Sequence, residues 1–483
     1  MTPAISELID SVRAALGPKA VITDPTEIAP WLDDWRGRYH GTASAILAPD
    51  SREGVATILA LAHAARVPLV PQGGNTGMVG GATPPADGSA LILSLRRMNR
   101  IRSIRPEDGL AIAEAGVILA DLHAAAEAQG MRFPLTLGAR GSATIGGLAS
   151  TNAGGTQVLR FGTMRSLIAG IEAVLPDGSV HDGLAALKKD NRGYDLNQLL
   201  IGAEGTLGVV TAATLRLVPA ITGRAVAWVG LADPETALAL LRRLEGGTDR
   251  IESFEIIPDA TLALVLKHIP GTRAPLESAH EWHVLIEAVT DDPADAESPV
   301  ELLERLLAPA LADGQVADAV IAASEAQAES FWRIRHSISE AERADGPAMQ
   351  HDVSVPVAGM PRFMVEAAAA CEERFPGTRA SGFGHLGDGN VHFHVRAPRG
   401  IDPQRWYAEE GPVITRFVND LVVAAGGSIS AEHGIGQMKL AELERLSSPA
   451  RMAALRAIKA AFDPHALMNP GKLVALAPAP LAP

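Results

Sequence analysis

The first half of the chain alternates segments of helical periodicity with short apolar runs. Residues 51–67 place apolar side chains at three- and four-residue intervals, which predicts a helix, and VPLVP at 67–71 predicts a short buried strand after it. A second strand is expected at 90–95, and the strand-and-helix pattern recurs up to Gly130. At 168–182, IAGIEAVLPDGSVHD has a Pro-Asp-Gly turn between two apolar runs, so we expect a strand–turn–strand unit there.

After Pro219 the pattern changes to strand-like segments separated by amphipathic helices. Strands are expected at 225–231, 283–289 and 316–322, and helices at 234–246 and 298–311. This order predicts an α+β domain in which helices cover an antiparallel sheet.

The rest of the chain contains longer helical patterns and one hairpin pattern. We expect one long helix over 324–343, a strand, tight turn and strand over 379–397, and helices near 405–425 and 449–462. The tail at 476–483, LAPAPLAP, has low complexity, and we expect it to be mobile.

The length and composition restrict the class of protein. A chain of 483 residues is too long for one hydrophobic core, and 47% apolar with 20% charged residues is typical of a globular protein. The formal net charge of −14 argues against nucleic acid as the main ligand, because phosphate binding depends on clustered Lys and Arg. We expect neither a membrane span nor a signal peptide, so we predict a cytoplasmic protein. The single cysteine, Cys371, cannot form an internal disulfide and is interpreted as a packing residue of a helix.

Three glycine-rich segments each lie beside an apolar strand, at 71–81, 138–155 and 202–208. Glycine lets backbone N–H groups approach a phosphate closely, so these loops are candidates for binding a nucleotide. None has the GxGxxG arrangement that opens a Rossmann helix, and the Walker pattern with its lysine is absent. The competing interpretation is a set of surface turns, which is weakened by the occurrence of three such loops.

A histidine cluster provides the second candidate site. GHLGDGNVHFH contains His385, His392 and His394, and SAEHGIG adds Glu432 and His433. Alternation along a strand places His392 and His394 on one face, and the turn LGDGN can fold His385 back towards them. Imidazoles with one carboxylate suit zinc or a similar divalent ion that keeps a coordination position open for a substrate. The competing interpretation makes His385 and His394 hydrogen-bonded core residues and Glu432 a solvated turn residue.

A further histidine pair, His280 and His283 in AHEWHV, lacks the HExxH spacing of a helical zinc site. We interpret this pair as part of a loop that enters a strand.

PQGGNTG, the segment from Pro134 to Gly155, and IGAEGTLGVVT resemble the FAD-binding domain of the vanillyl-alcohol-oxidase-type flavoproteins. The resemblance implies a two-part FAD-binding domain at 1–220, an α+β substrate domain at 221–425, and a C-terminal segment at 426–483 that returns to the flavin. Asn75 stands in the neighbourhood where some members attach FAD through a histidine, so a non-covalent flavin is expected. The residues implied in FAD binding are Pro71, Gln72, Gly73, Gly74, Asn75, Thr76, Gly77, Pro134, Gly138, Ser142, Thr144, Ile145, Gly146, Gly147, Asn152, Gly154, Gly155, Glu204, Gly205, Gly208, Val209, Val210 and Asn469.

GHLGDGNVH together with SAEHGIG resembles the metal site of the FAD-dependent D-2-hydroxyacid dehydrogenases within the same group, which act on D-2-hydroxyglutarate or D-lactate. The resemblance implies that His385, His392 and Glu432 bind one divalent metal, expected to be zinc, and that His433 is the catalytic base. A 2-hydroxy acid can chelate such a metal, which lowers the pKa of the hydroxyl group before hydride transfer to the flavin.

FWRIRHSISEAERADG and MQHDVSVP resemble the part of these enzymes that binds the distal carboxylate of the substrate. The resemblance assigns Arg335, Ser339, Gln350 and His394 to substrate binding, and Arg333 is expected to point elsewhere. Three of these positions depart from the hydroxyglutarate enzymes: Ser339 replaces Thr, Gln350 replaces Lys, and His394 replaces Asn. Loss of one charge-assisted hydrogen bond is worth roughly 1.5–3 kcal/mol, enough to change the preferred substrate.

The sequence therefore predicts a flavoenzyme that oxidises a D-2-hydroxy acid, with D-2-hydroxyglutarate as the first substrate, 2-oxoglutarate as its product, and D-malate or D-lactate as alternatives. An electron-transfer flavoprotein or a quinone is expected to accept the electrons, and the chain is expected to form a homodimer. The competing hypotheses are a metal-free flavin alcohol oxidase, a flavin-bearing electron-transfer subunit, and a non-enzymatic flavin or metal store.

Overall fold

The computed structural model describes residues 2–476. Residues 477–483, most of the tail expected to be mobile, lie outside the described part. The chain divides into two compact units. Unit 1 comprises Met1–Gly155, Phe161–Ala220 and Glu432–Pro483, and unit 2 comprises Thr156–Arg160 and Ile221–Ala431.

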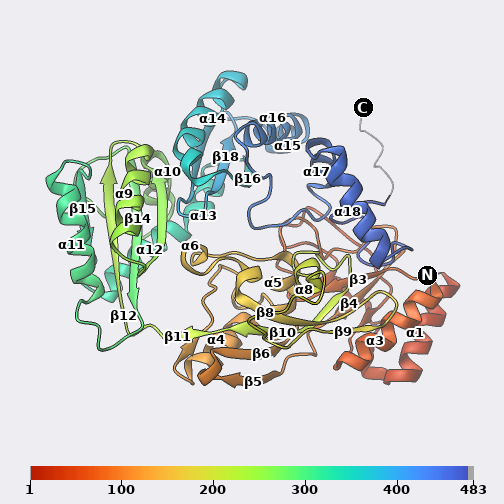
Figure 1. The fold of residues 1–483 in the computed structure, drawn as a ribbon. Coiled ribbons are helices and arrows are strands. Elements are labelled where there is room, and N and C mark those ends of the chain that lie inside the picture. Colours follow the sequence, from red (N-terminus) through yellow and green to blue (C-terminus); the bar gives the residue numbers. More distant parts are fainter. Residues whose placement is uncertain (1, 477–483) are drawn as a thin grey trace. The chain divides into compact units, whose positions relative to one another are not determined.

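A four-stranded sheet with the order β1-β2-β4-β3 forms the first part of unit 1 (Figure 1). Its strands are β1 (Val21–Ile22), β2 (Ile46–Leu47), β3 (Leu69–Gln72) and β4 (Leu91–Ser94). Strands β2, β4 and β3 are parallel, because the connecting helix α3 (Arg52–Ala65) returns the chain to the same end of the sheet. The helix and strands predicted for 51–71 and 90–95 are confirmed. The first glycine-rich loop starts where β3 ends.

An antiparallel sheet with the order β5-β6-β10-β8-β9 forms the second part of unit 1. Its strands are β5 (Ile101–Arg105), β6 (Leu110–Glu114), β8 (Ile168–Val174), β9 (Val180–Asp182) and β10 (Val209–Arg216). The strand–turn–strand prediction for 168–182 is confirmed by β8 and β9. A two-stranded ribbon pairs β7 (Met131–Arg132) with β11 (Val218–Pro219).

One glycine-rich segment is not wholly a loop. Residues 145–151 form helix α5 (Ile145–Thr151) inside the loop expected at 138–155. A Cβ on Gly146 would lie 2.6 Å from the Cβ of Ala115, so glycine at this position permits the helix to pack closely on the sheet. The interpretation of the whole segment as a loop was wrong because composition alone does not distinguish a glycine turn from a closely packed helix.

The remaining helices of unit 1 are short or amphipathic. They are α1 (Pro3–Leu16), α2 (Pro25–Ile28), α4 (Leu119–Glu127), α7 (Met164–Leu167), α8 (Leu196–Leu200), α17 (Leu440–Leu446) and α18 (Pro449–Phe462), and α6 (Val158–Phe161) begins in the segment assigned to unit 2. After α18 the chain returns to the first sheet, where Met468 forms a parallel bridge with Leu69.

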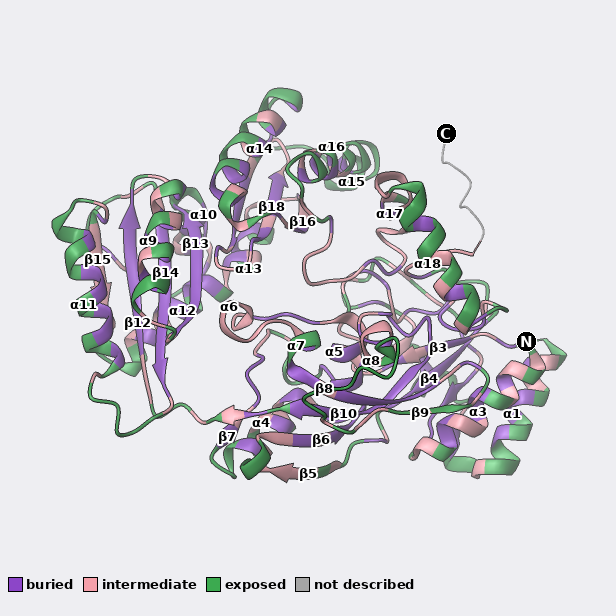
Figure 2. Cartoon of the chain, in the orientation of Figure 1, coloured by how far each residue is buried: buried purple, intermediate pink, exposed green. Residues whose placement is uncertain are grey.

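Unit 2 is built on a seven-stranded antiparallel sheet with the order β15-β12-β14-β13-β17-β18-β16. The strands are β12 (Gly223–Leu231), β13 (Ile251–Pro258), β14 (Trp282–Thr290), β15 (Asp318–Ile321), β16 (Ala348–Ser354), β17 (Arg379–His385) and β18 (Asn390–Arg396). Alternate residues of β12 belong to different hydrophobic clusters: Ala227 and Val229 to one, Val226 and Trp228 to the other. Helices therefore cover both faces of the sheet, as expected for an α+β domain (Figure 2).

Two groups of helices cover this sheet. Helices α9 (Pro234–Gly247), α11 (Pro299–Ala312), α14 (Met360–Arg374) and α16 (Gly411–Ala424) supply side chains to one cluster. Helices α10 (Asp259–His268), α12 (Glu325–His336) and α13 (Ile338–Asp345) supply the other, and α15 (Pro403–Glu409) precedes α16. Cys371 is fully buried in α14, which confirms its interpretation as a packing residue.

The single helix expected over 324–343 is two helices, α12 and α13, which meet at Ser337. The stretch Ser337-Ile338-Ser339 places two hydroxyl side chains at the break, and such side chains compete with the helix for backbone hydrogen bonds. Among residues 2–476, no helix is long and apolar enough to span a membrane.

Candidate active site

The three glycine-rich segments meet within unit 1. A Cβ on Gly73 would lie 2.2 Å from Oγ1 of Thr144, and a Cβ on Gly74 would lie 1.9 Å from the backbone oxygen of Ser142. Gly205 approaches Pro71 in the same way, at 3.1 Å from its Cγ, and has a positive φ of 70°. The first loop can therefore lie this close to Thr144 and Ser142 only because Gly73 and Gly74 have no side chain, and the positive φ of Gly205 favours glycine at the third contact.

Asn469 brings the C-terminal segment to the same loops. Its Nδ2 donates to the backbone oxygens of Gly81, at 2.8 Å, and Glu204, at 2.7 Å. The buried Oδ1 of Asn469 and the buried Oγ1 of Thr144 have no hydrogen-bond partner among the described residues. Unpartnered buried polar atoms beside closely packed glycines fit a site for a large polar ligand such as FAD.

Glu204 has a structural connection that the sequence did not indicate. Its carboxylate accepts hydrogen bonds from the backbone N–H groups of Ile435 and Gly436, each at 2.7 Å. Burial raises the pKa of Glu204, and the two N–H groups oppose that shift. The side chain therefore ties the loop that carries His433 to the third glycine-rich segment.

Asn152 also makes structural hydrogen bonds, because its Oδ1 accepts from Oγ1 of Thr163 and the backbone N–H of Arg165. Val209 and Val210 begin the buried strand β10. Asn75 has a φ of 52°, and its Nδ2 donates to the backbone oxygen of Asp33. The assignment of the individual loop residues to FAD stays a prediction.

In unit 2, β17, β18 and β16 present one polar face, which we call the histidine face. Strand register aligns its residues in three rows across the strands. The rows are His385–Asn390–Ser354, Phe383–His392–Asp352 and Ser381–His394–Gln350. The intervening residues Val391, Phe393 and Val395 belong to the hydrophobic core, so the polar residues share the opposite face.

His385 is held by a carboxylate from a neighbouring strand. Its Nδ1 donates to Oε1 of Glu255 at 2.6 Å, and Nε of Arg335 donates to Oε2 of the same carboxylate at 2.7 Å. Burial would raise the pKa of Glu255, but the charges of Arg335 and His385 outweigh it and lower this pKa to about 2. Glu255 is therefore ionised, and its bond to Nδ1 fixes the orientation of the His385 imidazole.

His392 lies beside His385, with ring centroids 5.5 Å apart. Its Nδ1 is 3.9 Å from Oδ1 of Asp352, and that oxygen also accepts from Nδ2 of Asn390 at 2.9 Å. Burial lowers the pKa of His392, and the charges of Arg335 and His385 lower it further. The imidazole of His392 is therefore held neutral, the form that binds metals.

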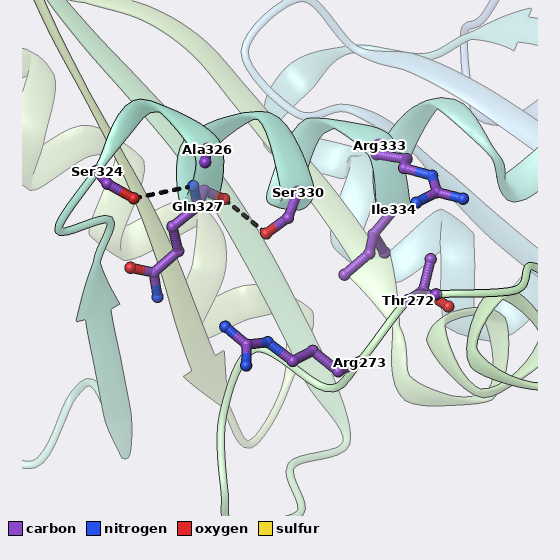
Figure 3. Close-up of a pocket in the computed structure, with 9 residues that line it drawn as sticks. Thr272, Arg273, Ser324, Ala326, Gln327, Ser330, Arg333 and Ile334 are labelled. Atoms are coloured by element: carbon purple, nitrogen blue, oxygen red, sulfur yellow. Dashed lines mark hydrogen bonds between the residues drawn. The ribbon is translucent and has the colours of Figure 1, made fainter.

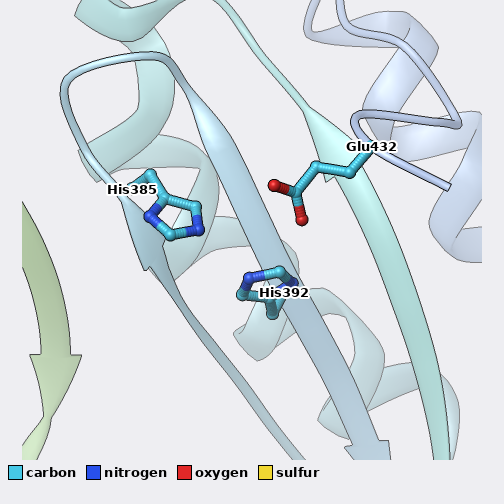
Figure 4. A group of neighbouring side chains, drawn as sticks. All are labelled: His385, His392 and Glu432. Atoms are coloured by element: carbon cyan, nitrogen blue, oxygen red, sulfur yellow. The ribbon is translucent and has the colours of Figure 1, made fainter. Parts of the chain in front are cut away.

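The ligand atoms of His385, His392 and Glu432 all lie within 4.8 Å of one another, and Figure 4 shows the two imidazoles and the carboxylate converging. Glu432 follows Ala431, whose backbone N–H donates to the backbone oxygen of Asp352 at 3.4 Å. The ligand atoms of Asp352, Glu432 and His433 also lie within 4.8 Å of one another. The group predicted from the sequence is thus brought together, and Asp352 is an additional candidate ligand.

The residues expected at the distal end of the substrate occupy different positions. Arg335 is buried beside the candidate metal ligands, with its guanidinium carbon 5.2 Å from the ring centroid of Phe383. Gln350 and His394 share the third row of the histidine face, and Ser339 lies in the first turn of α13. Their role in substrate binding stays a prediction.

Arg333 lies on the opposite side of α12 from Arg335, and its Nη2 donates to the backbone oxygen of Pro270 at 2.7 Å. It borders a separate cavity of about 260 Å³ (Figure 3). This cavity is lined by Gly271, Thr272, Arg273, Ser324, Ala326, Gln327, Ser330, Arg333 and Ile334. The expectation that Arg333 points elsewhere is confirmed.

The second histidine pair, His280 and His283, lies where a loop enters strand β14, as expected. His283 accepts from Nε1 of Trp228 at 3.1 Å, and its Nε2 lies 3.2 Å from Asp259. Sequence reasoning missed Glu255 and Glu342, two buried carboxylates that bind His385 and His394. The signal was an acidic residue inside an otherwise apolar strand or helix face, since buried charges are found mainly where they are paired.

We expect Glu255→Gln to lower metal affinity roughly tenfold to a hundredfold, because the carboxylate that orients His385 is lost. Metal content after dialysis against graded zinc concentrations measures this change. Glu252→Gln is the matched control, since Glu252 is also buried in β13 but pairs with Arg160 at 3.5 Å. Equal zinc affinity in the two variants would show that Glu255 does not support the site.

Comparison with known families identifies the class of protein. A model described as "FAD binding domain" matches residues 43–183, and one described as "FAD linked oxidases, C-terminal domain" matches residues 222–473, more than half of the chain. The chain therefore belongs to the family of FAD-linked oxidases.

Two relatives match nearly the whole length of this chain. The chain is 36% identical over 470 residues to the mitochondrial D-2-hydroxyglutarate dehydrogenase of Arabidopsis thaliana, covering 97% of this chain and 82% of the relative. It is also 36% identical to D-2-hydroxyglutarate dehydrogenase of Xanthomonas citri pv. viticola, covering 96% of both chains. These matches confirm the resemblance on which the predicted enzyme class rests.

The fold is confirmed independently by a solved structure. p-Cresol methylhydroxylase with substrate bound superposes with a TM-score of 0.74 at 15% identity, covering 98% of this chain and 97% of the other. The fold is thus that of the vanillyl-alcohol-oxidase-type flavoproteins, with an α+β architecture.

Proposed function

We propose that this chain oxidises a D-2-hydroxy acid at C2, with FAD and a divalent metal, and that D-2-hydroxyglutarate is the first substrate to test. The grouping of His385, His392 and Glu432 within 4.8 Å carries this proposal. The family match and the printed activity of the relatives support it.

A bound divalent cation, zinc in our proposal, would be held by these three residues and would polarise the carboxylate and hydroxyl oxygens of the substrate. FAD, when bound, supplies the acceptor for the hydride from C2. Glu255 orients His385, and Asp352 and Asn390 support the strand position of His392. His433 accepts the proton of the substrate hydroxyl, and Glu204 holds the backbone immediately after it.

We assign FAD binding to residues 1–220, substrate binding to 221–425, and completion of both sites to 426–483. In this assignment the glycine-rich loops and Asn469 bind a non-covalent FAD. Arg335, Ser339, Gln350 and His394 surround the substrate. Gln350 adds no positive charge at the distal end, which keeps D-malate and D-lactate as alternative substrates.

An electron-transfer flavoprotein or a quinone is the acceptor we propose, and a homodimer the assembly. A cytoplasmic location stays a prediction. The printed name of the Arabidopsis thaliana relative places that relative in mitochondria.

The experiment is a panel of D- and L-2-hydroxy acids offered to the purified protein with an artificial electron acceptor dye. We expect dye reduction with D-2-hydroxy acids and none with their L-enantiomers. Dye reduction without any added protein partner would exclude a flavin subunit that depends on one. Oxidation of simple alcohols, with no response to any 2-hydroxy acid, would contradict the proposal and favour an alcohol oxidase.

A further inference from the structure

The third row of the histidine face contains a buried carboxylate that the proposed chemistry does not use. Glu342, on α13, is fully buried, and its Oε2 binds Nδ1 of His394. Its other oxygen, Oε1, has no hydrogen-bond partner among the described residues, and neither does the buried Oγ of Ser381 in the same row. A carboxylate oxygen only accepts hydrogen bonds while it is ionised, so this position lacks a donor.

This row lies next to the candidate metal ligands. His394 is two residues from His392 on the same strand face, a separation of about 7 Å along an antiparallel strand. The ring of Phe383 contacts both imidazoles, at centroid distances of 5.1 Å from His392 and 5.3 Å from His394. A five-carbon acid held at C1 and C2 by the metal would therefore bring its distal group to the third row.

Two cationic side chains near this row have carboxylate partners. Arg335 is paired with Glu255 at 2.7 Å, and Arg396, two residues beyond His394, is paired with Asp345 at 3.5 Å. A second substrate carboxylate would meet the buried charge of Glu342 and offer it no proton. A neutral amide or hydroxyl group could donate to Oε1 of Glu342 and accept from Ser381.

We propose that Glu342 is a specificity-determining residue that makes the distal end of the site prefer a neutral hydrogen-bond donor to a second carboxylate. This inference rests on the proposed oxidation of D-2-hydroxy acids and names the class of substrate within it. D-2-Hydroxyglutarate remains a substrate, but a D-2-hydroxy acid of the same length with an amide or hydroxyl terminus is preferred.

The test compares D-2-hydroxyglutarate with its 5-monoamide, which has the same length and one negative charge less. In the unmodified protein we expect kcat/KM to favour the monoamide roughly tenfold to a hundredfold, with most of the difference in KM. In Glu342→Gln a neutral amide replaces the carboxylate and its charge, and the ratio should move towards the dicarboxylate by at least about tenfold. The ratio does not depend on the fraction of active enzyme, so a general loss of folding does not change it.

Glu340→Gln is the matched control, because Glu340 is exposed on the same helix and should leave the ratio unchanged. If Glu342→Gln fails to fold, the ratio of the two kcat/KM values is compared between the unmodified protein and His394→Asn, which removes the imidazole bound to Glu342. That comparison then decides the question. The inference is overturned if the unmodified protein favours the dicarboxylate, or if Glu342→Gln and Glu340→Gln give the same ratio. Absence of turnover with every D-2-hydroxy acid would instead reject the proposed function on which the inference rests.

Discussion

Replacing His433 with alanine is expected to lower kcat for D-2-hydroxy acids by roughly two to four orders of magnitude, the usual contribution of a general base. The side chain lies in the Asp352, Glu432 and His433 group, whose ligand atoms are within 4.8 Å of one another. Without the imidazole, the hydroxyl proton has no positioned acceptor when the C2 hydride leaves. Steady-state turnover and the flavin absorbance of the purified variant measure the two consequences, and we expect the protein to remain yellow.

The appropriate control is His40→Ala, since His40 is exposed and pairs with Asp33 at 2.9 Å, outside the grouped residues. This control should retain full turnover. A His433→Ala enzyme that turns over at the unmodified rate would remove His433 as the base. Loss of the yellow colour would assign its effect to flavin binding instead.

Replacing His392 with alanine is expected to remove the metal and with it nearly all turnover. Burial and the neighbouring positive charges lower the pKa of His392, so its imidazole is neutral and free to bind a cation. Alanine leaves only His385 and Glu432 of the three proposed ligands, and a stable site that also binds substrate needs three protein ligands. Elemental analysis after gel filtration measures the metal, and dye reduction measures the turnover.

Treatment of the unmodified protein with a chelator should reproduce this loss without release of flavin. Added zinc should then restore the unmodified protein but not His392→Ala. His268→Gln tests whether any histidine change in unit 2 has this effect, because His268 binds Asp345 rather than the candidate ligands. Unchanged metal content in His392→Ala would show that the metal binds at another site or that the protein holds no metal.

The parts of the site that depend on local sequence were predictable. The turn between His385 and Asn390 reverses the chain in a short glycine-containing segment, and strand alternation then fixes which histidines share a face. The glycine-rich loops were visible in the same way, since each follows or precedes an apolar strand.

The supporting carboxylates were not predictable, because they reach the site through strand order and not through sequence distance. Glu255 contacts His385 across 130 positions of the sequence, since β13 lies beside β17 in the sheet. Glu342 contacts His394 across 52 positions of the sequence, from α13, which the sequence had predicted only as part of one continuous helix. A periodic pattern identifies elements but does not state which of them become neighbours.

Anaerobic mixing of D-2-hydroxyglutarate with metal-loaded and metal-free protein tests the central claim most directly, with the flavin absorbance as the signal. We predict that the flavin is bleached only when the protein carries the metal and the substrate is the D-enantiomer. Equal bleaching of metal-loaded and metal-free protein would contradict a role for His385, His392 and Glu432 in holding a catalytic metal.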